Sequence, residues 1–580
     1  MALAWLIVCV LAAGSSDARE IDREQVLGGL SFIDQVEVTV VNIDVFVRDR
    51  DGRPVTGLEK GDFRLVQDGI EREISHFAAY SEDVLGKLAG PGPGAEPEAQ
   101  PQPAEVGDDA GGTRTEPATT AVTPVEPVFI VLYVDNENLR PHDRNRVLAQ
   151  IRRFIRGVMK PHVRIMVVSA ARSATIVQPM TDDPKAVEDA LRSLVRSYGA
   201  RVDDDRDRGR IIHDLQELPV DAASGGSRQS RAAARELEER IRVYGEELAI
   251  ELGSSTGALR EVLTTLAGLQ GRKVLVHVSN GLPAVPARDL IDWYGDVNQR
   301  ASTLPLLARF NRRYLFEALA SSANAQGVTF YTIDATGLGG DAPSSAEYLR
   351  PVDPLYAGLY SLNHQEPLLL LAERTGGRAL VGSNDVAGML DSLRDDLFTY
   401  YSIGHTLPTT GADTVHRIEV EIPGHPEFEV IYRRTLVEKS LETQVQDTVV
   451  SGLMLARDDN PMGLELRAGT TAATAEDRWL LPIELSLPIE SVAMLPERDE
   501  VVGRVVVFVA NRDSEGRQSD VQRRQFELRM PVADYQRRQN ERYVAEFDLL
   551  LNAGEHRVVV GTLDPVTRQA SFVSLSRTVP

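Results

Sequence analysis

Cysteine is almost absent from this sequence, since Cys9 is the only one among 580 residues. Intramolecular disulfides are therefore excluded, and no motif of clustered cysteines and histidines is available for a metal. Cys9 also lies within the apolar residues 2–13, a segment that we expect to be removed. We therefore predict a mature chain without thiol chemistry.

Basic residues and long hydrophobic runs are also scarce. The chain has 63 Lys and Arg residues against 86 Asp and Glu residues, which gives a formal net charge of −23. That balance disfavours a phosphate-binding surface, so we expect no nucleic-acid partner. Beyond residue 13 no stretch is long and apolar enough for a transmembrane helix, so we expect no membrane span.

The apolar residues 2–13 are too few to cross a bilayer. Small residues follow them, and Ser16 and Ala18 fit the small-x-small cleavage site of a secretory signal peptide. We therefore expect residues 1–18 to be a signal peptide. The mature protein should then be extracytoplasmic, either periplasmic or secreted.

Catalytic signatures are missing as well. The sequence has no nucleophile elbow, no zinc-binding helix and no Gly-rich phosphate loop. The 10 histidines are scattered, and His142, His162, His213 and His277 share no ligand spacing. We therefore expect a protein that is not an enzyme.

What the sequence does contain is a buried strand at residues 128–134, VFIVLYV, which runs directly into Asp135. A strand with one wet face would alternate polar and apolar residues, so this run indicates a strand covered on both faces. Amphipathic helices and further apolar strands alternate up to residue 405. This alternation predicts an α/β doubly wound, mostly parallel sheet over residues 128–405.

Two insertions interrupt that pattern. Residues 197–253 open with mixed charges and continue as a helix over 228–252, before another helix over 257–270. We interpret the first insertion as a solvated helical excursion. The second insertion, residues 282–313, contains Trp293, Tyr294 and Phe310, which either anchor a partner or seat the insertion on the sheet.

The flanking segments have the alternation of antiparallel strands, which predicts all-β sandwich domains. The predicted units are an N-terminal β unit at 30–81, a disordered linker at 82–127, a β-hairpin at 412–435 and a C-terminal β-sandwich at 447–580. The first unit has too few strands to close a core alone. We therefore predict that residues 412–435 pair with residues 30–81, with the α/β domain inserted between them.

Polar residues end several of the predicted strands of the α/β domain. Since the carboxyl ends of parallel strands meet at one edge of a sheet, their oxygen atoms should converge there, as a hard divalent cation requires. Thr256 and Asn280 have simpler interpretations, as a helix N-cap and a turn residue. The candidate binding residues are Asp135, Glu137, Asn138, Thr256, Asn280 and Asp334.

Four segments together resemble a known family. They are VTVVNIDVFVRDRDGRPVTGLEKGDFRLVQDG, LQGRKVLVHVSNGLP, GVTFYTIDATGL and LAERTGGRALVGSND. Residues 128–405 resemble a von Willebrand factor type A domain, and residues 36–435 are similar to VWFA-related domain proteins of the acidobacterial type. The resemblance implies a protein-binding fold without catalysis.

In type A domains a metal-ion-dependent adhesion site uses D-x-S-x-S with a distant Thr and a distant Asp. Asp135 and Thr256 match that pattern, whereas Glu137 and Leu139 replace the two serines and Asn280 stands where the Asp is expected. The resemblance therefore implies a degenerate site, with Asp135 and Thr256 as the remaining metal ligands. We expect no cofactor beyond weak Mg²⁺ or Ca²⁺ binding.

The sequence thus predicts an exported, non-catalytic adhesion-type module that binds another protein or an envelope macromolecule at the carboxyl edge of the sheet. Two alternatives stay open. One is an envelope hydrolase with a metal at Asp135, Glu137 and Asp334, and the other is a purely structural envelope protein.

Overall fold

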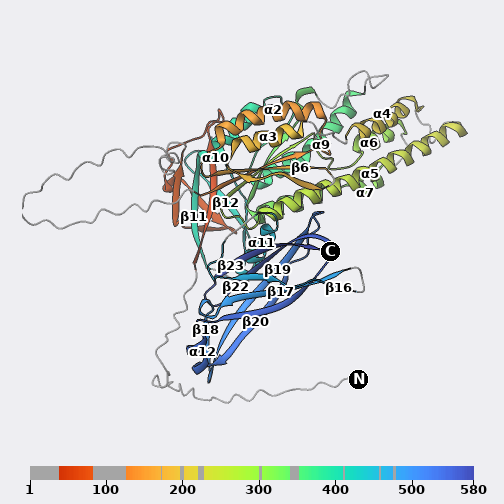
Figure 1. Ribbon diagram of the computed structural model, residues 1–580. Helices are drawn as coiled ribbons and strands as arrows, with labels where there is room; N and C mark the ends of the chain where they lie inside the picture. The colour runs from red at the N-terminus through yellow and green to blue at the C-terminus, as the bar shows by residue number, and fades with distance from the viewer. Residues whose placement is uncertain are drawn as a thin grey trace, which may run out of the picture.

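The structure is a computed structural model, and Figure 1 shows its arrangement. It describes residues 38–81, 126–171, 173–195, 201–219, 227–298, 303–339, 352–408, 412–455, 459–474 and 478–580. The expected signal peptide, nearly all of the expected linker and parts of both insertions lie outside these residues. Within the described residues no helix is long and apolar enough to cross a membrane.

A six-stranded sheet forms the centre of the α/β domain, in the order β10-β9-β8-β5-β6-β7. All neighbours in it are parallel except β6 and β7, which pair antiparallel. The mostly parallel α/β class predicted from the sequence is therefore correct. The strands are β5 (Val128–Asp135), β6 (Val163–Ala170), β7 (Ala174–Thr181), β8 (Arg272–Ser279), β9 (Val328–Asp334) and β10 (Ala379–Leu380).

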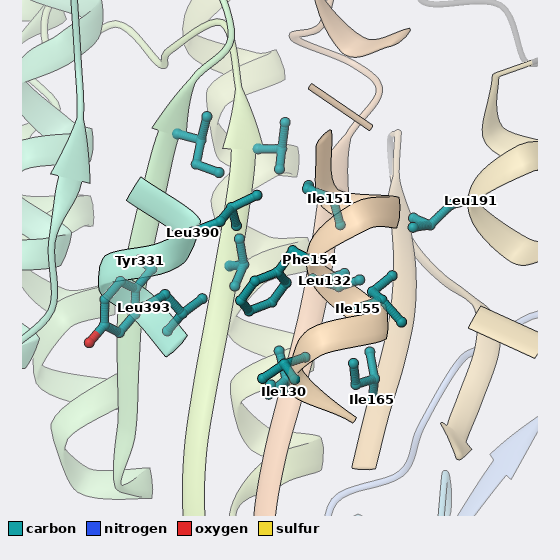
Figure 2. Close-up of a cluster of buried hydrophobic side chains, with 14 of the residues drawn as sticks. Ile130, Leu132, Ile151, Phe154, Ile155, Ile165, Leu191, Tyr331, Leu390 and Leu393 are labelled. Carbon is teal, nitrogen blue, oxygen red and sulfur yellow. The ribbon is translucent and has the colours of Figure 1, made fainter. Parts of the chain in front are cut away.

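Helices cover both faces of this sheet, because alternate residues of each strand point to opposite sides. Ile130 and Leu132 of β5 pack under α2 (Pro141–Val158), α3 (Pro184–Leu194) and α10 (Val386–Phe398), as Figure 2 shows for part of this core. Val131 and Tyr133 belong to the other core, under α5 (Arg228–Leu266), α8 (Arg313–Gln326) and α9 (Pro354–Thr375). Covering on both sides explains why VFIVLYV has no polar position.

The two helices predicted at 228–252 and 257–270 are a single helix, α5, of 39 residues. At 1.5 Å per residue it is about 58 Å long. Its C-terminal half packs on the sheet, and Figure 1 shows its N-terminal half extending beyond the sheet. The boundary placed at residue 253 was therefore wrong. The sequence GSSTG at 253–257 is typical of a loop, but burial of Leu252 and Leu259 against the sheet keeps it helical.

The two insertions pack against each other. Helices α4 (Arg201–Glu217), α6 (Arg288–Val297) and α7 (Leu304–Phe310) share a separate apolar core with the N-terminal half of α5. The first insertion is therefore more than a solvated excursion. Its buried Arg208 pairs with the buried Asp289 of the second insertion at 2.6 Å.

The flanking β domain is a sandwich of two four-stranded sheets, ordered β13-β1-β11-β4 and β14-β12-β2-β3, around a common core. Residues from both ends of the α/β domain contribute to it, because β1 pairs with β11 and β13, and β2 pairs with β12. The strands are β1 (Val38–Arg48), β2 (Arg64–Gln67), β3 (Ile70–Arg72), β4 (His76–Tyr80), β11 (Tyr400–Pro408), β12 (Thr414–Glu421), β13 (Glu429–Tyr432) and β14 (Thr435–Glu438). The short helix η1 (Lys60–Asp62) precedes β2.

The hairpin predicted at 412–435 is wrong in one respect. Within the described residues 412–455, β12 and β13 do not pair with each other but lie in the two different sheets of the sandwich. Ile418 and Val420 of β12 therefore reach the core from one sheet, while Val430 of β13 reaches it from the other. Because the chain crosses from one sheet to the other between β12 and β13, the apolar side chains of the two strands enter the core from opposite sheets. In a hairpin both strands would lie in the same sheet and enter the core from one side.

The C-terminal domain begins with α11 (Leu441–Gly452) and continues as two antiparallel sheets that pack on a shared core. Helix α11 lies between β19 and β22 of this domain and α5 of the α/β domain (Figure 1). The domain boundary predicted at residue 447 therefore falls inside a helix. The elements are β15 (Glu465–Ala468), β16 (Ala472–Ala473), β17 (Trp479–Pro488), η3 (Ile489–Ser491), β18 (Met494–Glu497), β19 (Glu500–Asp513), β20 (Gln522–Pro531), α12 (Val532–Arg538), β21 (Arg542–Leu551), β22 (Gly554–Leu563) and β23 (Ala570–Val579).

A buried ion pair ties the flanking sandwich to the α/β domain. Arg48 of β1 contacts Asp396 of α10 at 2.5 Å, and both side chains are almost fully buried. The Tyr331 hydroxyl donates to the same carboxylate at 2.8 Å, and Arg378 lies 3.4 Å from it. Because Arg48 and Asp396 are both desolvated, removing the charge of either one would leave the other buried without an opposite charge beside it.

Candidate functional site

The candidate site lies where the chain order of the sheet reverses. From β5 the chain proceeds to β6 and β7 on one side, and then returns to β8, β9 and β10 on the other. Open α/β sheets bind ligands in the crevice at such a switch point, outside the carboxyl ends of the strands. Asp135 ends β5, Ser279 ends the adjacent β8, and Asp334 ends β9.

Both oxygens of the Asp135 carboxylate are occupied by protein donors. Asn138 Nδ2 lies 3.1 Å from each of them, and the Asn138 backbone N–H donates to Oδ1 at 3.3 Å. The Ser279 hydroxyl donates to Oδ2 at 2.9 Å. The amide of Asn138 therefore sits between the two oxygens, where a cation bound by both of them would lie.

His277 is fully buried beside this carboxylate, with Nε2 at 3.6 Å from Asp135 Oδ2. Its ring meets Tyr133 edge to face, with ring centroids 5.4 Å apart. Burial, and next the charge of Asp135, hold the pKa of Tyr133 well above its usual value. The surroundings of Asp135 are therefore a desolvated core rather than a wet rim.

Asn280 and Asp334 form a second part of the network. The Asn280 side chain accepts from the Arg140 backbone N–H at 3.1 Å and donates to Asp143 at 2.8 Å and to Thr336 at 3.2 Å. Asp334 accepts from Thr336 through Oδ1 and from Gln365 of α9 through Oδ2 at 2.9 Å. The loops after β5, β8 and β9 are thus cross-linked into one unit.

Thr256 does not join this network. It lies inside α5, and its hydroxyl donates to the carbonyls of Leu252 at 2.8 Å and Gly253 at 3.1 Å. It is therefore not an N-cap, and its hydroxyl is not directed at Asp135, so the structure does not bring these two expected ligands together. Its neighbour Ser255 takes part instead, since Asn138 Nδ2 lies 3.2 Å from the Ser255 hydroxyl.

A divalent cation does not fit these residues. The oxygens of Asp135 already accept from Asn138 and Ser279, and the Thr256 hydroxyl is used within its helix. Leu139 is fully buried in the apolar core. Among the residues that the structure describes, no group of three or more His, Cys, Asp or Glu side chains is gathered as a metal site would require.

Most of the candidate binding residues are buried, so they do not themselves form an exposed binding surface. Asp135, Thr256, Asn280 and Asp334 are all nearly inaccessible, while Glu137 is half-buried. Helix α9 covers part of the edge, and Gly281 with φ of 92° permits this approach, since a Cβ there would lie 2.6 Å from the His364 carbonyl oxygen. The buried candidates form the hydrogen-bonded network that holds this edge of the sheet. Glu137 and Asn138 are half-buried and are the candidates that reach the surface.

The aromatic anchors predicted at the rim are not at the surface. Trp293, Tyr294 and Phe310 are buried in the core shared by the two insertions. Trp293 stacks on Tyr356 with ring centroids 4.6 Å apart, and the Tyr294 hydroxyl donates to the Ala234 carbonyl at 3.1 Å. These rings seat the second insertion, which is the alternative that the sequence left open.

Several residues of the network were missed from the sequence. Ser255 and Ser279 each immediately precede a residue that was selected, and a shift of one position along a helix or strand redirects the side chain. Asp143 had a signal of its own, as the acidic residue in the first turn of α2. The further members are Thr336 and Gln365.

No protein-family model and no curated protein match the sequence. Among solved structures, the chain is similar to BatB from Bacteroides thetaiotaomicron, with 9% identity, a TM-score of 0.24 and coverage of 47% of this chain and 97% of that one. It is also similar to the vWF domain of the type V pili tip protein Mfa5 from Porphyromonas gingivalis, with 12% identity, a TM-score of 0.24 and coverage of 47% and 96%. The PilB minor pilin from Streptococcus sanguinis gives 10% identity, a TM-score of 0.24 and coverage of 48% and 64%. TM-scores of this size establish neither the fold family nor the function of this chain.

Proposed function

We propose that residues 128–405 form a von Willebrand factor A-type domain of a non-catalytic, extracytoplasmic protein that binds another protein or an envelope macromolecule. The family assignment is supported by the sequence segments that resemble VWFA-related proteins. It is supported further by the sheet order, which has the 3-2-1-4-5-6 pattern of doubly wound sheets with β5 as the first strand.

The observation that carries the binding site is the cross-linked carboxyl edge. The Asn280 side chain after β8 joins the three loops, through hydrogen bonds with Arg140 and Asp143 on the β5 side and with Thr336 after β9. Asn138 also ties the loop after β5 to Ser255 of α5. Loops held on a rigid sheet are where α/β domains place recognition, and a fixed surface costs less entropy on binding than a mobile one. We propose that Glu137 and Asn138 on this edge contact the partner.

In this proposal the partner is bound without a bridging cation. In an intact adhesion site the Asp and Ser oxygens face a metal, whereas here the Asn138 amide lies between the oxygens of Asp135. The hydrogen bonds from this amide satisfy the carboxylate oxygens that a cation would otherwise coordinate. Partner binding should therefore persist when divalent cations are removed.

The test is capture of partners from the native envelope fraction by the full chain, quantified by mass spectrometry. Glu137→Arg should reduce the captured partner strongly, because it reverses a charge at the proposed contact. Glu555→Arg, at an exposed position of β22, is the matched control and should capture as wild type does. EDTA should leave the capture unchanged.

Two outcomes contradict the proposal. Equal capture by wild type and Glu137→Arg would move the binding surface away from this edge. Loss of capture with EDTA would show that a cation takes part after all.

A further inference from the structure

A large cavity lies at the amino edge of the six-stranded sheet, opposite the edge that carries Asp135. Its volume is about 800 Å³, and it is lined from all three domains. The α/β domain contributes the segments before β8 and β9, the flanking sandwich contributes β14, and the C-terminal domain contributes α11 and the loop after β22. A cavity of about 190 Å³ adjoins it through shared lining residues, among them Lys273 and Arg433.

Lys273, the second residue of β8, is only 7% exposed. Its Nζ donates to the Leu269 carbonyl at 2.9 Å, and no carboxylate within the described part of the chain lies at ion-pair distance from it. Burial, and next the nearby charges of Arg433 and Lys439, together lower the pKa of Lys273 to about 7, against a smaller opposing effect of Asp447. Lys273 is thus a buried amine without a carboxylate at ion-pair distance among the described residues.

Arg433 is a second cation at this cavity, and it is half-buried. Its buried Nε has no hydrogen-bond partner among the described residues, and burial lowers the pKa of its guanidinium, against a smaller opposing effect of Asp44. A Cβ at Gly327 would lie 3.6 Å from both Lys273 Nζ and Arg433 Nη1. The two cationic groups therefore converge on the same point beside Gly327, at the wall of the cavity.

The acidic residues that line the larger cavity each contact a partner other than these two cations. Asp447 contacts Lys439, and Glu442 pairs with Arg523 at 2.8 Å. Glu438 lies 3.5 Å from His416. Two cationic groups facing one cavity, one buried and one half-buried, disfavour each other's charge, and a bound anion would offset that cost.

We propose that this cavity binds a small molecule bearing an oxyanion group, with Lys273 and Arg433 as its ligands. Both side chains donate hydrogen bonds only, and charge-assisted bonds to a carboxylate or phosphate oxygen are the contacts that would satisfy them. A chain with a net charge of −23 does not attract anions by its overall field, so affinity must come from this local pair. Because three domains line the cavity, the bound molecule would also stabilise their relative placement.

The test is isothermal titration calorimetry on the full chain with inorganic phosphate and, separately, with citrate, each against sodium chloride at equal ionic strength. The wild type should bind at least one of the two anions and not chloride. Lys273→Met and Arg433→Gln should each weaken that binding about tenfold or more, the loss expected for a charge-assisted hydrogen bond. Arg434→Gln, the exposed neighbour, is the matched control and should bind as wild type does.

Binding of phosphate alone or of citrate alone supports the proposal and names the oxyanion. Binding of neither, or undiminished binding in both variants, overturns it. The melting temperature of each ligand-free variant separates weaker binding from a folding defect. Removing one of two repelling charges should raise that melting temperature, whereas a folding defect would lower it.

Discussion

Replacing Lys273 with Met should make the protein more stable at neutral and acidic pH. Met has a similar length and no charge, so it fills the same space at β8 while removing the desolvated ammonium. The cost of that ammonium follows from its pKa, which burial, and next the charges of Arg433 and Lys439, lower from an ordinary 10.5 to about 7 in the folded protein. At about 1.4 kcal/mol per pKa unit, the variant should gain roughly 5 kcal/mol near pH 6, less about 1 kcal/mol for the lost bond to Leu269.

The gain should depend on pH with a definite sign. Between about pH 7 and 10.5 the unfolded chain holds a proton on Lys273 that the folded protein does not, so the stability of the wild type rises with pH in that window. The advantage of the variant should therefore shrink to about zero by pH 10, where the remaining cost of the ammonium no longer exceeds the roughly 1 kcal/mol of the lost bond to Leu269. Melting temperatures of both proteins from pH 6 to 10 measure this, with Lys185→Met, at an exposed position of α3, as control. A difference that stays constant with pH, or a less stable variant at pH 6, would refute the reasoning.

Four further substitutions test other parts of the structure. Asp396→Asn should lower the stability by about 3–5 kcal/mol, seen as a lower melting temperature, because it leaves Arg48 buried without its ion pair. Gly268→Val should undock the C-terminal domain and enlarge the radius of gyration in X-ray scattering, since a Cβ there would lie 2.6 Å from the Thr448 Cα of α11. Asp135→Asn should cost about 1–3 kcal/mol, because the new amide opposes donors from Asn138 and Ser279. Glu137→Ala, at a half-buried position, should leave the melting temperature nearly unchanged.

Local signals in the sequence were sufficient where one chemical requirement determined the structure. The unbroken run at β5 requires cover on both faces, and helices cover both. Asp183 followed by Pro184 predicted the start of α3, where the Asp183 side chain accepts from the Lys185 N–H. Asp68 and Gly69 predicted the turn between β2 and β3, and both have positive φ.

The sequence was insufficient where tertiary packing decided the outcome. Ser254, Ser255 and Gly257 are poor helix residues, yet the neighbouring apolar residues of α5 pack on the sheet and keep the helix continuous. The candidate site illustrates the same limit, because the strand ends were located correctly but the direction of the Thr256 side chain was not. Thr256 turns into its own helix, and Ser255 faces Asn138 in its place.

The way in which the flanking sandwich is assembled fixes when it can form during protein synthesis. The Leu58 backbone N–H donates to the Tyr401 hydroxyl across 343 residues of chain. Both partners of β1, and the partner that β2 has besides its hairpin neighbour β3, lie beyond residue 399. At a synthesis rate of about 5–20 residues per second, the N-terminal strands wait roughly 20–70 s for those partners. The strands that are made first are therefore among the last to acquire their pairing, and during that interval their edges are open to other chains.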